Sequence, residues 1–139
     1  MPDLDHTPNQ EERTTRLKTD LIAWLATGRP DGRPHLVPVW FWWHLDELIV
    51  IAEPGSQKVK NLKANPRLSI ALDDSNRGTT PIMLEGTATL DPVSPDLPEL
   101  VSYFAKYRET MAVMNWSEAE SRASHSMVIR IRIDRFLTF

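Results

Sequence analysis

Apolar and polar residues alternate with a period of two along most of the chain, which predicts β-strands. Between Ile129 and Ile133 the isoleucines alternate with arginines, the pattern of a strand with one buried face. Residues 68–72 and 82–90 show the same alternation. The run 48–52 is apolar throughout and rich in β-branched residues, which is typical of a buried strand.

The first structured segment has the pattern of a helix that passes into a strand. Leu17 and Leu21 have helical spacing, whereas residues 22–26 alternate as in a strand. We therefore predict a helix ending near Lys18, followed by a strand.

A hairpin and an aromatic strand come next. Asp31-Gly32 is typical of a hairpin turn, and we predict one strand from Arg33 to His44. Pro34 and Pro38 lie within it. Because proline cannot donate to a strand ladder, we expect this strand at an edge, at a bulge, or with one side open to a ligand.

The remaining segments include short helices. Gly55-Ser56 opens and Asn65-Pro66 closes one of about two turns. After a proline-rich break at 91–98, helical spacing predicts a second helix through Leu100–Tyr107 and a further piece near 117–122. About six strands joined by short links, with peripheral helices, predict an α+β fold built as a mostly antiparallel six-stranded barrel.

Composition indicates one ordinary globular domain. The chain has 139 residues, of which 41% are hydrophobic and 25% charged, and only its polar beginning lacks a structural pattern. We predict a flexible tail over residues 1–12 and one folded domain over residues 13–139.

Charge and residue content exclude several classes of function. The net charge of −3 argues against a nucleic-acid partner. Without an apolar span or signal core we expect no membrane partner and a cytoplasmic location. The chain has no cysteine, and its four histidines lack metal-ligand spacing, so we expect no metal. No nucleophile elbow or triad pattern identifies a catalytic residue.

The helix that starts after Ser56 has the features of an anion site. Ser56 stands at the N-cap position, and Lys58 and Lys60 fall in or near the first turn. Backbone N–H groups, a hydroxyl and ammonium groups therefore converge. Basic residues there oppose the helix dipole unless an anion compensates them. The alternative is an ordinary serine cap on an amphipathic helix that buries Val59 and Leu62.

The aromatic run 40–43 is a second candidate. Trp40 and Trp42 fall on one face of the predicted strand, and Phe41 and Trp43 on the other. Such rings can stack on a planar ligand, but large aromatic residues lie more often in a core or an interface. The backbone beside Pro38 is the better candidate for ligand contact.

Short motifs in a characteristic order cover residues 14–138. They are Trp24-Leu25-Ala26-Thr27, Asp31-Gly32-Arg33-Pro34-His35, Pro38-Val39-Trp40-Phe41, Gln57-Lys58, Asn61-Leu62, Asn65-Pro66-Arg67, Leu84-Glu85-Gly86-Thr87-Ala88 and Lys106-Tyr107. Together they resemble the pyridoxamine 5'-phosphate oxidase-like split β-barrel superfamily of flavin and deazaflavin proteins. More narrowly, they resemble its F420-dependent branch.

This resemblance implies a homodimer with two cofactor sites between its subunits. It implies an F420-dependent oxidoreductase that transfers a hydride between the deazaflavin cofactor and a small organic substrate. An FMN-binding oxidase or reductase of the same fold, and a non-catalytic flavin, deazaflavin or haem carrier, are the alternatives. The implied cofactor contacts are Pro38, Val39 and Trp40 for the ring, and Ser56, Gln57, Lys58 and Asn61 for the phosphate.

Overall fold

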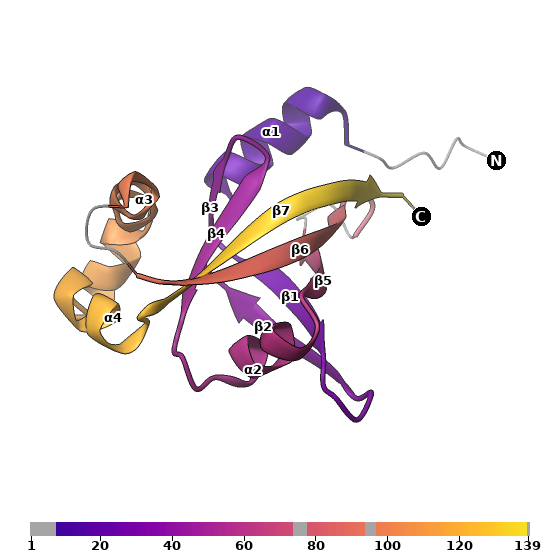
Figure 1. Ribbon diagram of the computed structural model, residues 1–139. Coiled ribbons are helices and arrows are strands. Elements are labelled where there is room, and N and C mark those ends of the chain that lie inside the picture. Colours follow the sequence, from indigo (N-terminus) through magenta and orange to yellow (C-terminus); the bar gives the residue numbers. More distant parts are fainter. Residues whose placement is uncertain (1–7, 74–77, 94–96, 139) are drawn as a thin grey trace.

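One curled antiparallel sheet forms the body of the molecule (Figure 1). The computed structural model describes residues 8–73, 78–93 and 97–138. Within them the strand order is β2-β1-β5-β6-β7-β4-β3, and every pairing is antiparallel. The strands are β1 Ala23–Gly28, β2 Pro34–Val39, β3 Trp42–His44, β4 Glu47–Ala52, β5 Arg67–Leu72, β6 Ile82–Pro92 and β7 Met127–Leu137. The predicted α+β antiparallel fold is thus confirmed.

Four helices lie around this sheet among the described residues. They are α1 Gln10–Thr19, α2 Gln57–Ala64, α3 Pro98–Val113 and α4 Glu118–Ser124. Helices α3 and α4 lie together at one side of the sheet, and α2 lies at its lower end in Figure 1. Helix α2 contacts β1 and β6, while α3 contacts β3.

Helix α1 begins inside the segment predicted as a tail. Residues 1–7 lie outside the described residues, but Gln10 already belongs to the helix. The Asn9 side chain accepts a hydrogen bond from the Glu12 N–H, and Glu11 and Glu12 place negative charge in the first turn. Both features stabilise a helix N-terminus, so residues 10–12 are helical instead of a continuation of the tail.

The predicted strand from Arg33 to His44 is two strands, so the sheet has seven strands among the described residues instead of six. Strands β2 and β3 are separated by Trp40-Phe41 and form opposite edges of the sheet. The two-residue link therefore crosses the split in the barrel. The sequence pattern continues through this link, because alternation of apolar residues does not report a change of strand partner.

The β1–β2 hairpin is regular, although its turn is centred differently from the prediction. The Arg29 N–H donates to the Arg33 carbonyl, and the Gly32 N–H donates to the Arg29 carbonyl. Pro30 and Asp31 are thus the central pair, and Gly32 follows with φ of 90°. A residue without Cβ adopts this left-handed conformation readily.

Strand β6 extends to Pro92, so the predicted proline-rich break at 91–98 begins later than expected. Residues 94–96 of that break lie outside the described residues.

Two side chains of α3 satisfy the backbone at the split. The Phe41 N–H donates to the Tyr107 hydroxyl over 2.9 Å, and that hydroxyl donates to the Leu21 carbonyl over 2.7 Å. Lys106 Nζ donates to the Phe41 carbonyl over 3.0 Å. Burial raises the pKa of Tyr107 and lowers that of Lys106 to about 8. Backbone groups that lack a strand partner here are therefore hydrogen-bonded by side chains.

Apolar side chains form two cores on opposite sides of the sheet. Phe41 belongs to the core inside the barrel, together with residues such as Leu25 and Ile129. Trp40 and Trp42 pack instead against the core between the sheet and α3. The predicted alternation of the aromatic run is thus confirmed.

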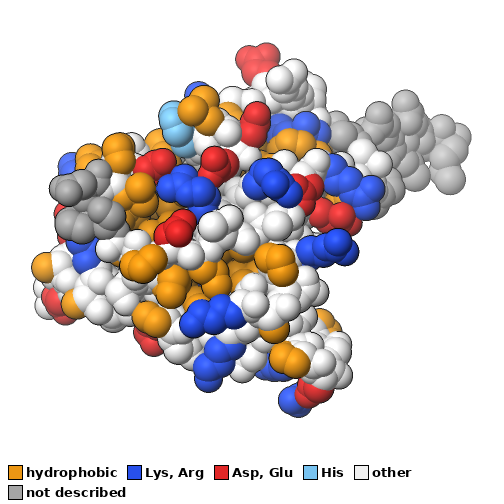
Figure 2. All heavy atoms as spheres, in the orientation of Figure 1, with side chains coloured by type: hydrophobic (Ala, Val, Ile, Leu, Met, Phe, Trp, Pro, Cys, Tyr) orange, Lys and Arg blue, Asp and Glu red, His pale blue; other side chains and the backbone are white. Residues whose placement is uncertain are grey.

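Apolar side chains are also visible at the surface. Figure 2 shows a group of them between β6 and α2 on the face in view.

The hydrogen bonds of Tyr107 predict a stability difference between two tyrosine variants of α3. Tyr107→Phe leaves the buried Phe41 N–H unsatisfied, so we expect a loss of about 1–3 kcal/mol in the free energy of unfolding. The matched control is Tyr103→Phe, because the Tyr103 hydroxyl makes no hydrogen bond with a described residue. Urea unfolding at one protein concentration measures both, and equal losses would contradict the role of Tyr107.

Candidate functional site

A cavity of about 190 Å³ lies where the end of β2, helix α2 and the α3–α4 corner meet. It brings together residues that are far apart in the sequence. Its lining residues are Pro38, Val39, Trp40, Ile51, Lys58, Tyr103, Trp116 and His125. Four of the predicted site residues, Pro38, Val39, Trp40 and Lys58, thus line one space.

Lys58 is a half-buried cation without a direct partner. It forms no hydrogen bond or ion pair with a described residue. Burial lowers the pKa of Lys58, and the charge of Glu53 partly opposes this effect. A partly buried ammonium group that lacks a partner is costly unless a ligand pairs with it. The cavity is therefore suited to an anion.

Ser56 has the backbone conformation of an N-cap residue but does not cap the helix. Its φ and ψ are −67° and 155°, yet its side chain accepts no hydrogen bond from the first turn of α2. The Oγ atom is buried and has no hydrogen-bond partner among the described residues. The alternative of an ordinary serine cap thus lacks the hydrogen bond that defines it. The hydroxyl therefore lacks a described partner at this helix terminus, and Ser56 is not one of the residues that line the cavity.

Gln57 and Asn61 are used within the protein instead. Gln57 Nε2 donates to Asn61 Oδ1 over 2.8 Å, and Asn61 Nδ2 donates to Thr27 Oγ1 over 3.0 Å. Asn61 is fully buried. This chain of hydrogen bonds fixes α2 on β1. Asn61 is therefore placed to position the helix, and its predicted contact with a cofactor does not fit this burial.

Trp40 is held between other aromatic rings. Its ring stacks on Tyr107 with centroids 4.6 Å apart and an angle of 4°, and Trp116 lies 6.0 Å away. One face of the Trp40 ring is therefore covered. A ligand at the Pro38–Trp40 segment could contact the uncovered face of the Trp40 ring. It could also contact the backbone of β2, which is an edge strand.

Three lining residues come from segments that the sequence did not connect with the site. Tyr103 lies on α3, Trp116 in the α3–α4 corner, and His125 at the end of α4. Trp116 and His125 make an edge-to-face contact with centroids 5.3 Å apart. No local spacing relates these residues to Lys58, so only the tertiary arrangement could reveal them.

The family follows from comparison with known proteins. The pyridoxamine 5'-phosphate oxidase family model matches residues 10–139. The chain belongs to this family. A search of curated protein sequences finds no match.

Solved structures share the fold of this pyridoxamine 5'-phosphate oxidase family member. An F420 reductase is 25% identical, with a TM-score of 0.70 over 88% of this chain and 94% of the other. A conserved hypothetical protein from Mycobacterium tuberculosis is 24% identical, with a TM-score of 0.72 over 100% and 89%. The haem storage protein from Vibrio cholerae is 18% identical, with a TM-score of 0.68 over 93% of both chains.

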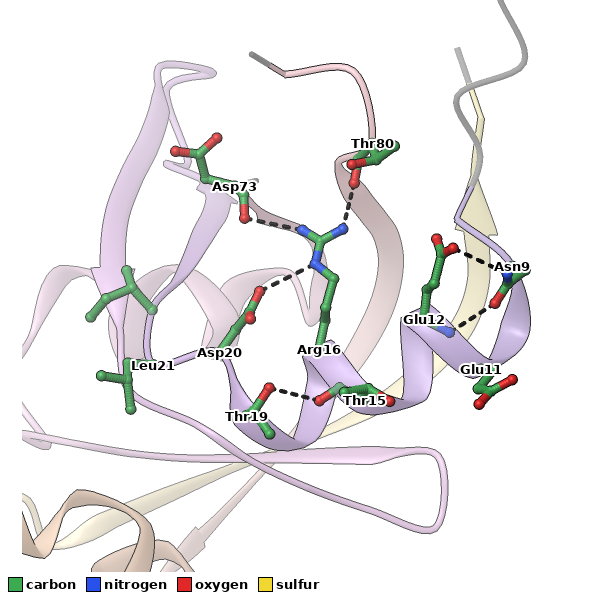
Figure 3. A pocket seen from close by; sticks show the side chains of 11 residues that line it. Asn9, Glu11, Glu12, Thr15, Arg16, Thr19, Asp20, Leu21, Asp73 and Thr80 are labelled. Atoms are coloured by element: carbon green, nitrogen blue, oxygen red, sulfur yellow. Dashed lines mark hydrogen bonds and ion pairs between the residues drawn. The ribbon is translucent and has the colours of Figure 1, made fainter. Parts of the chain in front are cut away.

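A larger hollow of about 1010 Å³ lies beside α1 (Figure 3). Arg16 crosses it and donates to the backbone carbonyls of Thr80 and Asp73, and its Nε lies 3.5 Å from Asp20. The guanidinium is therefore engaged in tying α1 to the sheet. In contrast to Lys58, it does not call for a ligand, and we assign the smaller cavity as the candidate site of this family member.

Metal and membrane features are absent from the described part of the chain. No group of three or more His, Asp or Glu residues there could hold a metal ion. No helix among residues 8–73, 78–93 and 97–138 is long and apolar enough to cross a membrane.

Proposed function

We propose that this protein is an F420-dependent oxidoreductase that transfers a hydride between the deazaflavin cofactor and a small organic substrate. One observation carries the proposal: the unpartnered, half-buried Lys58 shares a cavity with the edge-strand backbone at Pro38–Trp40. The likeness to an F420 reductase at 25% identity supports it.

The phosphate of the cofactor would lie at the start of α2. Lys58 supplies an ammonium group, and Ser56 supplies a buried hydroxyl without a partner. The first turn of α2 contains no acidic residue, so its N-terminal N–H groups and dipole also favour an anion. Gln57 and Asn61 hold this turn on β1 and keep the phosphate-binding groups in place.

The ring of the cofactor would lie along Pro38, Val39 and Trp40. Strand β2 is an edge of the sheet, so one side of its backbone is not used in strand pairing. When bound, F420 would supply the hydride chemistry, and the protein would supply binding, orientation and exclusion of water. The stacked Trp40 and Tyr107 give this wall of the site a fixed position.

A second copy of the chain would complete the site. The cavity of about 190 Å³ is smaller than the roughly 300–1,000 Å³ of ordinary small-molecule sites. Trp24 pairs with Pro38, and Ala26 with Leu36, so these four residues share one sheet face. Trp24 is 40% and Leu36 62% exposed, and this edge patch reaches the cavity through Pro38. We propose a homodimer that covers the edge patch and encloses the cofactor.

The edge patch gives a prediction for assembly. Light scattering at micromolar concentration should show twice the 15.9 kDa chain mass. Leu36→Glu places a charge in the proposed interface and should yield monomer. Leu45→Glu is the matched control, since Leu45 is 77% exposed in the β3–β4 turn, and it should remain dimeric. A monomeric unmodified protein would contradict the shared site.

Lys58 gives a prediction for cofactor affinity. Lys58→Ala should weaken F420 binding by about 1.5–3 kcal/mol, the range for a hydrogen bond to a charged group. Lys63→Ala removes an exposed lysine from the last turn of the same helix and should cost at most about 1 kcal/mol. Fluorescence titration measures both affinities, and thermal melting checks the fold. An unchanged affinity in Lys58→Ala would refute the phosphate assignment.

The choice of cofactor is tested by titration with F420 and FMN side by side. Both carry a phosphate for Lys58, but F420 has a further anionic tail, and Lys60, Lys63 and Arg67 are exposed along or after α2. Each should add about 0–1 kcal/mol toward F420, and the preference should shrink with salt. FMN binding at least as tightly at low and high ionic strength would overturn the F420 assignment. Binding without turnover across a panel of electron acceptors would favour a carrier.

A further inference from the structure

His125 is a titratable group in the cavity that the proposed function leaves unused. It follows the last residue of α4 and precedes β7. Its ring lines the cavity together with Lys58 and packs edge to face on Trp116. A histidine and a lysine that line the same cavity can place two positive charges around one space.

One nitrogen of His125 contacts Ser124, and the other has no partner among the described residues. Ser124 Oγ lies 3.1 Å from the Glu120 carbonyl, to which it donates, and 2.8 Å from His125 Nδ1. When the hydroxyl donates to this carbonyl, its oxygen accepts a hydrogen bond from Nδ1–H, and the charged imidazolium, which has a proton on both nitrogens, can only donate there. Nε2 makes no hydrogen bond with a described residue. In the charged imidazolium Nε2 carries a proton and can donate it to an anion.

The charges that act on His125 come from two neighbouring elements. Burial is the main cause of the lowered pKa of His125; the negative charge of Glu53 opposes it, and the positive charge of Lys58, a smaller effect than that of Glu53, lowers it further. Tyr103, the other titratable residue in the lining, stays neutral because burial raises its pKa. Glu53 is exposed and also attracts Lys58. An anion in the cavity would replace the repulsion between Lys58 and protonated His125 by attraction to both.

We propose that His125 is a second, proton-dependent positive partner of the anion that Lys58 binds, so that anion binding takes up a proton and tightens in acid. The proposal rests on the proposed function only for the identity of the anion as the cofactor phosphate. The sign follows from linkage. An anion favours the charged imidazolium, so it raises the pKa of His125, and affinity increases as pH falls through that pKa.

Sulfate is a suitable probe, because it stays doubly charged between pH 5 and 8 and does not depend on the cofactor. The pKa of His125 is measured by NMR titration of its imidazole in sodium sulfate and in sodium chloride of equal ionic strength. Sulfate should raise this pKa by about 0.5–1. In Lys58→Met the difference between the two salts should largely disappear. An equal pKa of His125 in both salts would overturn the proposal.

F420 affinity provides the second measurement. The unmodified protein should bind F420 about three- to tenfold more tightly at a pH below the pKa measured for His125 in chloride than at pH 8, the factor that corresponds to such a change in pKa. His125→Gln should lose this dependence and match the unmodified protein at pH 8. His44→Gln, which alters an exposed histidine of β3, should keep it.

The two measurements separate the two proposals. A sulfate-dependent pKa of His125 without F420 binding would overturn the proposed cofactor and support the role of His125. Tight F420 binding whose affinity is the same at both pH values, in the unmodified protein and in His125→Gln, would overturn the role of His125 and leave the proposed function standing.

Discussion

The hydrogen bonds of the Tyr107 hydroxyl hold together the place where this barrel is split. Strands β2 and β3 are consecutive in the chain but lie at opposite edges of the sheet, so the link between them has no strand to pair with. Tyr107 accepts from Phe41 and donates to Leu21, and Lys106 donates to the Phe41 carbonyl. Leaving those backbone groups buried without partners would cost about 1–3 kcal/mol each. Because Trp40 stacks on Tyr107, the same tyrosine also fixes the position of the Trp40 ring in the wall of the cavity.

Cations in this protein differ in whether they have partners, and the difference marks the site. Arg130 lies between Glu47 and Glu99, and Arg16 binds backbone carbonyls and Asp20. Lys58 is comparably enclosed but has only a distant attraction to Glu53. The fold accounts for the paired cations, whereas the half-buried and unpaired Lys58 supports the proposed anion site. The unpartnered hydroxyl of Ser56 at the same helix terminus points the same way.

The family accounts for the scarcity of catalytic side chains. In cofactor chemistry the protein chiefly binds and orients, so the lack of a triad agrees with an oxidoreductase as well as with a carrier. Members of one fold differ in function through their sites, as the F420 reductase and the haem storage protein of similar fold illustrate. The features that distinguish this chain are therefore the residues that line its cavity, including His125, and the proposed cover by a second copy.

The sequence by itself determined most of the local structure and named four of the residues that line the candidate cavity. Alternation located most strands, the turn and proline signals placed α2, and the N-cap and charge pattern made Ser56 and Lys58 candidates, because these features depend on neighbours in the chain. Only the tertiary structure decided that the aromatic strand breaks at Trp40-Phe41, that Asn61 binds Thr27, and that His125 lines the same cavity as Lys58. Periodicity reports which face of an element is buried but not what covers it. Contacts between distant segments arise from the curl of the sheet, which brings the end of α4 beside the start of α2.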